Sequence, residues 1–252
     1  MTIDAPKPEQ SRQLRALWQE AFGDSEEFLD TFAATAFSPD RCRCVCVDGK
    51  VAAALYWFRC SHMGQPVAYL YAVATAKAHR GKGLCRALME DTHTHLEKLG
   101  YAGAVLVPGN EDLFRLYAGL GYQVCGGISE ITCTPNDRGT TLHRVDKEVY
   151  ARLRRELLPS GGVVQERENL DFLQAQATLY AGPGFLLAAR QEGDQLHGLE
   201  LLGDAGAAPG ILRTLDCASG TFRVPGDTPF AMYRPLGNST LPQPAYFGLA
   251  FD

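Results

Sequence analysis

The segment from Tyr69 to Leu88, YLYAVATAKAHRGKGLCRAL, constrains the fold more than any other part of the chain. Its first residues alternate between tyrosine and aliphatic side chains, a pattern typical of a β-strand. Its last residues begin an apolar stripe with the spacing of one helix face, formed by Leu84, Leu88, Thr92 and Leu96. The sequence therefore predicts a strand that passes through a turn into a helix.

The turn between this strand and helix reads Arg80-Gly81-Lys82-Gly83-Leu84-Cys85. Its two glycines allow a tight turn and bring backbone N–H groups close to a ligand. The first turn of the helix has unpaired N–H groups and a partial positive charge, and the Arg and Lys side chains add full charges beside them. The turn is therefore predicted to hold an anion such as phosphate or pyrophosphate.

Two common nucleotide-binding motifs do not fit the turn. A P-loop requires Ser or Thr after its lysine, whereas Gly83 follows Lys82, and a Rossmann fingerprint requires three glycines after the first strand. The spacing R-x-x-G-x-C instead resembles motif A of the GNAT N-acetyltransferase superfamily, Q/R-x-x-G-x-G/A, which binds the pyrophosphate of acetyl-CoA. Cys85 replaces Gly or Ala there, which its small size should allow. A solvated turn is the alternative for so short a motif.

A second segment, YAGAVLVPGNEDLFRLYAGLGY, strengthens the resemblance, which covers roughly residues 8–133. Residues 104–107 are predicted as a buried strand and Asn110 as the cap of a helix that carries Tyr117. In GNAT enzymes the corresponding strand splays from the one before it, and acetyl-CoA lies in the gap. The matching Asn often contacts the pantetheine arm, and the matching Tyr points at the thioester sulfur.

The resemblance implies a fold and an activity. The fold is α/β, with a mixed twisted sheet splayed between two central strands, flanking helices and a smaller α/β C-terminal half. The activity is transfer of an acetyl group from acetyl-CoA to a primary amine by direct attack in a ternary complex. The CoA thiolate that leaves needs a proton. A tyrosine phenol, with a pKa near ~10, can donate a proton to this thiolate, because the pKa of the corresponding thiol, near ~8.5, is close to that of the phenol.

The resemblance also assigns site residues. Acetyl-CoA is expected to contact the end of the splayed strand, the glycine turn and the helix cap, at Val73, Ala74, Thr75, Arg80, Gly81, Lys82, Gly83, Leu84, Cys85 and Asn110. Tyr117 is the expected catalytic acid, with ordinary packing of a helix aromatic as the alternative.

The general base is not identified by the sequence, because the strand at 66–76 carries no carboxylate. Four side chains are unranked candidates: His62, Glu111, Asp112 and Glu130. A fifth candidate is the terminal carboxylate of Asp252, since in larger two-part bacterial GNAT proteins the end of the chain enters the active site.

Charge and hydropathy exclude other classes of protein. A net charge of −5, with 29 carboxylates and no basic stripe, argues against a general nucleic-acid binder. No apolar run approaches the ~20 residues of a membrane span, and the N-terminus lacks a signal-peptide core. We therefore expect a cytoplasmic monomer or homodimer that binds neither nucleic acid nor membrane.

The eight cysteines include no CxxC pair, so neither a disulfide framework nor a metal site is expected. Cys42, Cys44 and Cys46 share one face of a predicted strand, where packing as small apolar residues is favoured over metal binding. His93 and His95 lie two apart on a helix and are expected at the surface.

The chain before the central strand is predicted to form two amphipathic helices, at 8–22 and 25–37. Strands at 42–47 and 50–61 follow, joined by an Asp48-Gly49 hairpin turn. In the GNAT family these two helices help to wall the acceptor site.

The chain after about residue 134 is predicted to repeat the order of these elements. Helices at 146–158 and 167–180 precede strands near 185–190 and 195–202, and residues 206–237 can be aligned with the glycine turn and the helix of Tyr117. Chance similarity is the alternative beyond residue 206, where Pro229 and Pro235 favour strand or loop over helix. The alignment leaves the second half without an equivalent of strand 66–75. We therefore divide the chain into a GNAT domain at 1–137 and a degenerate GNAT-like domain at 138–252.

Three functions remain open at this point. The first is an N-acetyltransferase that acts on a small-molecule amine. The second is a protein or peptide N-acetyltransferase, and the third is an acyl-CoA-binding sensor without turnover. Tyr117 and Asn110 favour an enzyme, and the extra half weakly favours a small substrate.

Overall fold

The computed structural model of the protein describes residues 1–251 of the 252-residue chain. Contacts within the chain divide it into two compact units. The first unit contains Met1–Tyr122 and Tyr233–Leu241, and the second contains Gln123–Met232 and the residues from Pro242 onward. A division by contacts does not establish which segments fold independently, so the predicted domain boundary at 137/138 stays a prediction.

The first unit combines helices with an antiparallel meander. Its elements in chain order are β1 (Thr2–Asp4), η1 (Pro8–Gln10), α1 (Ser11–Phe22), α2 (Glu26–Thr35), η2 (Pro39–Arg41), β2 (Cys42–Val47), β3 (Lys50–His62), β4 (Gln65–Thr75), η3 (Lys77–His79), α3 (Leu84–Lys98), β5 (Gly103–Leu106) and α4 (Glu111–Ala118). The predicted helices at 8–22 and 25–37 are confirmed, and the first is entered through the 3-10 turn η1. The predicted strands at 42–47 and 50–61 are confirmed as β2 and β3.

Local sequence accounts for these element boundaries. Ser25 caps α2, because its hydroxyl accepts a hydrogen bond from the backbone N–H of Phe28 at 3.1 Å. The hairpin turn between β2 and β3 places Gly49 at a φ of +76°, a conformation that glycine adopts without strain. Leu17 and Trp18 belong to the buried stripe that fixes α1 on the sheet.

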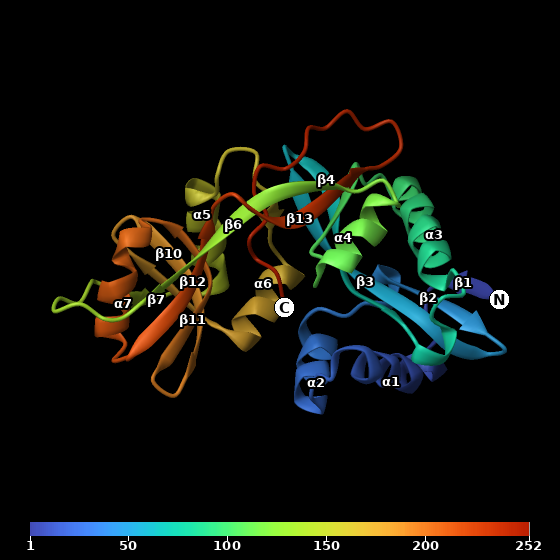
Figure 1. Cartoon of the computed structure of the whole chain (residues 1–252), viewed down its shortest axis with the longest axis horizontal. Helices are drawn as coiled ribbons and strands as arrows, with labels where there is room; N and C mark the ends of the chain where they lie inside the picture. Colours follow the sequence, from blue (N-terminus) through green and yellow to red (C-terminus); the bar gives the residue numbers. More distant parts are fainter. Residues whose placement is uncertain (252) are drawn as a thin grey trace. The chain divides into compact units, whose positions relative to one another are not determined.

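The sheet of the first unit is mixed. Strands β1 to β4 pair antiparallel in chain order, and β5 pairs parallel with β4 after the crossover through α3. Figure 1 shows α1 and α2 on one side of this sheet and α3 and α4 on the other. Beside β5 lies β13 (Thr228–Pro235), whose last residues belong to this unit. A late segment of the sequence thus completes the first sheet.

The second unit has a comparable mixed sheet. Its elements are β6 (Gln123–Cys133), β7 (His143–Arg144), α5 (Lys147–Leu157), β8 (Val164–Gln165), α6 (Glu168–Gln176), β9 (Thr178–Gly182), β10 (Phe185–Glu192), β11 (Gln195–Gly203), η4 (Ala205–Ala207), α7 (Ala208–Thr214), β12 (Ser219–Pro225) and the start of β13. The strand order is β6-β12-β11-β10-β9-β7, with β12 parallel to β11. Its core packs α7 against the sheet through Ile211, Leu212 and Phe222.

Two predictions for the second half are wrong. The predicted helix at 167–180 ends at Gln176, and residues 178–182 form β9, which pairs with β10. The expected absence of an equivalent to strand 66–75 followed from this error. With β9 counted, β9-β10-β11 repeats the antiparallel order β2-β3-β4, and in each unit a helix then leads to a parallel strand. The equivalent of β4 is therefore β11.

The alignment of Phe230 and Tyr233 with the helix of Tyr117 does not hold, and the prediction that Pro229 and Pro235 favour strand or loop over helix in this segment is confirmed. These residues lie in β13, between Pro229 and Pro235. Proline lacks the N–H group that a helix interior requires, and it is tolerated at strand ends.

A buried ion pair lies in the second unit. The Arg154 guanidinium donates to both carboxylate oxygens of Glu200, at 2.7 and 2.9 Å, and the two side chains are 2% and 0% exposed. The hydroxyls of Tyr150 and Tyr246 donate to the same carboxylate at 3.3 and 3.1 Å. Burial of a charge is tolerated when its hydrogen-bonding capacity is satisfied in this way.

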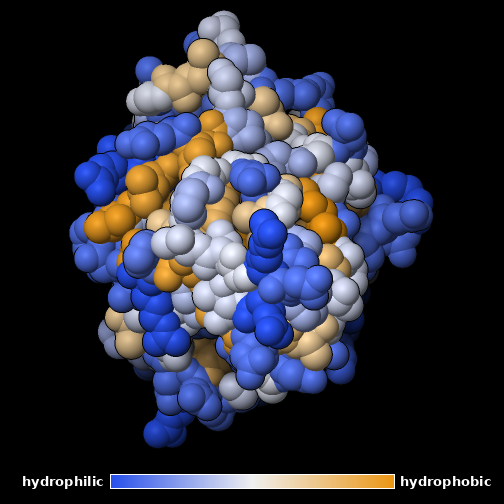
Figure 2. Space-filling model, turned by 90° about the vertical axis from the view of Figure 1, so that its left-hand side faces the viewer, coloured by the Kyte–Doolittle hydropathy of each residue, from blue (hydrophilic) through white to orange (hydrophobic). Residues whose placement is uncertain are grey.

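Figure 2 shows one face, on which apolar side chains gather in narrow areas between hydrophilic ones. Across the described part of the chain, none of the helices combines the length and the apolar character that crossing a membrane requires.

Candidate active site

The site begins where β4 and β5 separate. The two strands pair only from Val67 to Tyr69 on β4 and from Gly103 to Val105 on β5, while β4 runs on to Thr75. On its other edge β4 keeps its pairing with β3 up to Thr75. The backbone of β4 beyond Tyr69 is therefore unpaired with β5 among the described residues. This is the splay that the resemblance predicted.

An irregularity in β4 lies within the splayed part. The register with β3 shifts between the pairs Tyr56–Tyr71 and Ala54–Ala74, so that Ala72 and Val73 together oppose Leu55. Ala72 has a φ of +50°, which is uncommon for a residue with a side chain. A bulge re-aims the backbone and side chains around it. Val73 and Thr75, predicted to contact the cofactor, are half-buried, and Ala74 is buried.

The glycine turn after β4 has the geometry of an anion site. Gly81 and Gly83 have φ values of +74° and +77°, and a methyl group added to either would meet no atom of the described chain within 4 Å. Gly83 is the N-cap of α3, and no side chain caps that end of the helix. The first N–H groups of a 15-residue helix thus face an open approach.

Two cations flank this turn. The Arg80 Nε donates to the carbonyl of Thr75 at 3.1 Å, and the Lys82 Nζ donates to the carbonyl of Ala78 at 2.9 Å. Both side chains are exposed and keep further donors for a ligand. Unpaired N–H groups, two cations and free space above the glycines fit the pyrophosphate of a coenzyme A thioester.

Tyr117 lies on α4 and is 5% exposed. Burial raises the pKa of its hydroxyl, and the nearby Cys85 thiol raises it further. Burial also raises the pKa of Cys85, an effect that Arg86 partly offsets. The structure therefore places Cys85, from the first turn of α3, close to the phenol expected to act as the acid. The roles of both residues stay predictions.

Asn110 caps α4 as predicted, since its side-chain oxygen accepts a hydrogen bond from the backbone N–H of Leu113 at 3.0 Å. The cap leaves the side-chain NH₂ group as the part of Asn110 that can donate to a ligand. Its contact with the pantetheine arm stays a prediction.

The base candidates are dispersed. His62 is fully buried and pairs with Gln65 at the end of β4 opposite to the splay, so it does not reach the glycine turn. Glu111 and Asp112 are exposed in the first turn of α4, and Asp112 pairs with Arg115. Glu130 lies on β6 of the second unit. Asp252 lies outside the described residues.

A carboxylate that the sequence analysis missed lies beside the end of β4. The Glu20 carboxylate, on α1, accepts a hydrogen bond from the backbone N–H of Lys77 at 2.6 Å. Glu20 and Lys77 are 57 positions apart, and no local pattern in the sequence signals the contact.

An aromatic cluster covers the face of β4 that α1 and α2 pack against. The ring of Trp18 lies 4.8 Å from that of Phe32, 5.0 Å from that of Tyr56 and 5.6 Å from that of Tyr71, measured between centroids. Tyr71 is only half-buried and directly precedes the bulge. The rings of Trp18, Phe32 and Tyr56 are buried, so Tyr71 is the member of this cluster that is partly open at the splay.

His93 corrects a further prediction. It is 2% exposed, not at the surface, and its Nε2 lies 2.7 Å from the hydroxyl of Tyr122. Its Nδ1 lies 3.1 Å from Nη1 of Arg234, which also donates to the carbonyl of Leu120 at 2.6 Å. His95, in contrast, is half-buried.

All eight cysteines are free thiols, and Cys42 and Cys44 are buried as predicted.

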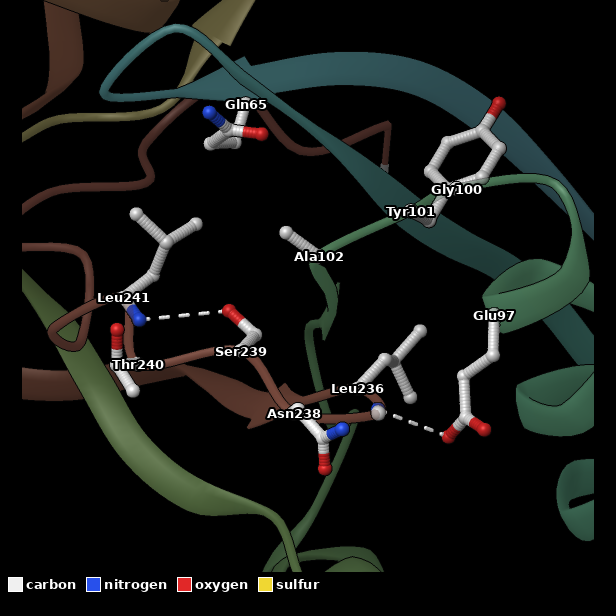
Figure 3. Close-up of a pocket in the computed structure, with 11 residues that line it drawn as sticks. Gln65, Glu97, Gly100, Tyr101, Ala102, Leu236, Asn238, Ser239, Thr240 and Leu241 are labelled. Carbon is white, nitrogen blue, oxygen red and sulfur yellow. Dashed lines mark hydrogen bonds between the residues drawn. The ribbon is translucent and has the colours of Figure 1, made fainter.

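A shallow pocket of about 430 Å³ lies at the opposite end of β4 and β5 from the glycine turn (Figure 3). Gln65 and Ala102 line it from the two strands, together with the loop that follows β13. The backbone N–H of Gly237 in this loop donates to Glu97 at 3.0 Å. Because β4 and β5 run parallel, a ligand here would be remote from the splay, and the pocket is not part of the candidate site.

Comparisons with known proteins agree with this geometry. Residues 2–125 match the model of a family described as "Acetyltransferase (GNAT) domain". Among solved structures, the chain resembles a GCN5-related N-acetyltransferase from Kribbella flavida, at 16% identity and a TM-score of 0.71 over 93% of this chain and 70% of that chain. It resembles one from Anabaena variabilis ATCC 29413 at 17% identity and a TM-score of 0.72, over 92% and 72% of the two chains.

A third similar structure is a conserved protein of unknown function from Enterococcus faecalis V583, described as a probable N-acyltransferase. It is 18% identical, with a TM-score of 0.72 over 93% of this chain and 72% of that chain. At these identities the likeness shows the fold, and the predicted α/β fold with its mixed, splayed sheet is confirmed. A comparison with curated proteins finds no significant match.

Proposed function

Because residues 2–125 belong to the GNAT acetyltransferase family, a family of acyl-CoA-dependent N-acyltransferases, we propose that this chain transfers the acetyl group of acetyl-CoA to a primary amine of a small molecule. The observation that carries the proposal is the end of pairing between β4 and β5 at Tyr69, followed by the open glycine turn at the start of α3. A thioester lying along β4 would have its pyrophosphate at the start of α3, the α-helix that follows this strand.

The reaction balances with one acid and one base. The neutral amine attacks the thioester carbonyl, the N–C bond forms, and backbone N–H groups near Val73 to Thr75 stabilise the oxyanion. The C–S bond then breaks, the amine loses a proton to the base, and Tyr117 gives a proton to the CoA thiolate. A raised pKa keeps the Tyr117 phenol protonated at neutral pH, which an acid requires.

The aromatic cluster supports a small acceptor. The half-buried ring of Tyr71 lies beside the bulge against the buried ring of Trp18, and β4 carries no carboxylate that would attract a polycationic substrate. A protonated amine is attracted to such a ring before it loses its proton. A protein tail rich in lysine would be expected to meet acidic side chains instead.

The second unit is proposed to be a degenerate GNAT-like domain in tandem with the first. The shared order of three antiparallel strands, a helix and a parallel strand supports this proposal. Its helix α7 has only seven residues and lacks a counterpart of Arg80 and Lys82, so we assign acetyl-CoA to the first unit alone. A cytoplasmic location and a monomeric or homodimeric state stay predictions.

The test is calorimetric titration of acetyl-CoA into the wild type and Tyr117→Phe, together with CoA release against a panel of amines and a lysine-rich peptide. We expect both proteins to bind and only the wild type to release CoA rapidly with small amines. Binding without release from any acceptor would indicate a sensor. Release only with the peptide would move the assignment to protein acetylation, and failure to bind would refute the site.

A further inference from the structure

Three side chains behind Tyr117 have no role in the proposed reaction. They are His93 on α3, Tyr122 just after α4, and Arg234 on β13, and all belong to the first unit. His93 and Tyr122 are both 2% exposed. Burying His93 and Tyr122, with the half-buried Arg234 beside them, costs desolvation, which hydrogen bonds must offset, so their arrangement invites a functional explanation.

The contacts determine which nitrogen of His93 carries the proton. A guanidinium group only donates hydrogen bonds, so Nδ1 of His93, 3.1 Å from Arg234, must act as the acceptor. The imidazole proton then lies on Nε2 and is donated to the hydroxyl oxygen of Tyr122 at 2.7 Å. His93 is neutral in this arrangement, in agreement with a pKa that burial and Arg234 lower to about 3.

The same reasoning leaves the Tyr122 hydroxyl proton free. Its oxygen accepts from His93, and within residues 1–251 no group accepts the proton of the Tyr122 hydroxyl. The nearest phenol is Tyr117, whose ring lies 5.8 Å from that of Tyr122 between centroids in an edge-on arrangement. Burial raises the pKa of the Tyr122 hydroxyl, the neighbouring Tyr117 raises it further, and Arg234 lowers it.

Arg234 also fixes the segment that carries Tyr117. Its Nη1 donates to the carbonyl of Leu120 at 2.6 Å, and the backbone N–H groups of Leu120 and Tyr122 donate to the carbonyl of Tyr117 at 2.9 and 3.1 Å. One arginine thus holds both the end of α4 and the ring that supports Tyr122.

We propose that Arg234, His93 and Tyr122 form a positioning relay, in which the Tyr122 hydroxyl donates its hydrogen bond to the Tyr117 oxygen as Tyr117 protonates the departing CoA thiolate. The inference rests on the proposed function. A phenol buried in an apolar site resists ionisation, and a donor directed at its oxygen offsets that resistance. Arg234 polarises this donor through neutral His93 without placing a charge beside the thioester.

The relay makes a prediction that a purely structural network does not. Tyr122→Phe and Arg234→Met are each expected to lower kcat for CoA release about 10- to 100-fold, because they weaken one proton transfer. The KM for acetyl-CoA should change less than about 2-fold, since none of the three residues belongs to the glycine turn. Arg234→Lys should recover part of the loss, because an ammonium group still donates and carries charge.

A double-mutant cycle is the decisive experiment. If Tyr122 acts through Tyr117, then Tyr122→Phe will cause no further loss of kcat in a Tyr117→Phe background. The matched control is Tyr150→Phe, which removes another buried, hydrogen-bonded hydroxyl in the second unit. That control should leave kcat unchanged in both backgrounds. Multiplicative losses from Tyr117→Phe and Tyr122→Phe would overturn the relay while leaving the proposed reaction intact.

Nitrogen NMR of His93 in the wild type provides a readout that does not depend on turnover. We expect the Nε2–H tautomer, with no titration between about pH 5 and 8, and its loss in Arg234→Met. An Nδ1–H tautomer, or titration near the usual pKa of histidine, would refute the relay. If the wild type releases no CoA with any acceptor, the proposed function fails first, and the relay falls with it.

Discussion

Replacing the glycines of the turn with alanine separates the cofactor site from the stability of the fold. Gly81 and Gly83 are exposed, have φ values of +74° and +77°, and have no described atom within 4 Å of an added methyl group. Gly49, in the hairpin turn between β2 and β3, has a φ of +76° and the same free surroundings. Gly49→Ala is therefore a matched control, with the same backbone conformation outside the glycine turn.

The expected cost in stability is the same at all three positions. An L-residue in this left-handed conformation costs about 1–2 kcal/mol, and no steric clash adds to that cost. Each variant should lower the free energy of unfolding by about that amount in urea titrations. Only Gly81→Ala and Gly83→Ala should also weaken acetyl-CoA binding, because their methyl groups would occupy the space through which a phosphate approaches the N–H groups of α3.

We expect the Kd for acetyl-CoA to rise about 10- to 100-fold in the two turn variants, equivalent to about 1.4–2.8 kcal/mol. Calorimetry well below the unfolding temperature measures it, and Gly49→Ala should bind like the wild type. Equal destabilisation of all three variants with an unchanged Kd would show that the glycines serve the turn alone. The anion-site interpretation of α3 would then be wrong.

Three further predictions concern charges. Glu200→Leu should lower the free energy of unfolding, measured in urea, by about 3–5 kcal/mol, because it leaves the Arg154 charge buried without a partner. The double variant with Arg154→Met should recover most of this lost stability, because it removes the unpaired charge as well. Between pH 3 and 6.5, His93 binds a proton in the unfolded chain but not in the folded one, because burial lowers its pKa to about 3. The free energy of unfolding should therefore rise with pH by up to about 1.4 kcal/mol per pH unit and level off above pH 6.5, and His93→Asn should remove this slope from urea unfolding measured against pH. Arg80→Ala and Lys82→Ala should each raise the Kd for acetyl-CoA several-fold at ~0.05 M salt, and the effect should shrink near ~1 M, where the Debye length is about 3 Å.

The elements that sequence could predict are those determined by their own residues. The strand, glycine turn and helix of residues 65–98 follow from side-chain alternation, two glycines and a 3.6-residue stripe, and all three form as predicted. The caps at Ser25 and Asn110 and the turn at Gly49 also depend on contacts within three residues. Short-range rules reach these features because the partners are close in the sequence.

The predictions that failed concern residues whose contact partners lie far away in the sequence. Residues 178–182 continue an apolar helical pattern, and only their pairing with β10 makes them a strand. His93 was expected at the surface because neighbours on a helix do not reveal Arg234, which is 141 positions away. The contact of Glu20 with the end of β4 was missed for the same reason. Tertiary contacts override local preference at such positions.

The first unit depends on residues from near the end of the sequence, and the contacts of Gly103 show why. A Cβ atom on this residue would lie 2.3 Å from the ring of Tyr233, so only glycine lets the two segments meet. The backbone N–H of Leu236 also donates to the carbonyl of Ala102 at 3.0 Å. The strand whose departure from β4 opens the site is thus held on its other side by residues from β13 and the loop after it. Arg234 lies between Tyr233 and Leu236, so the contact that orders β5 also carries the arginine to His93. The second half of the sequence therefore shapes the catalytic unit whether or not it binds a ligand of its own.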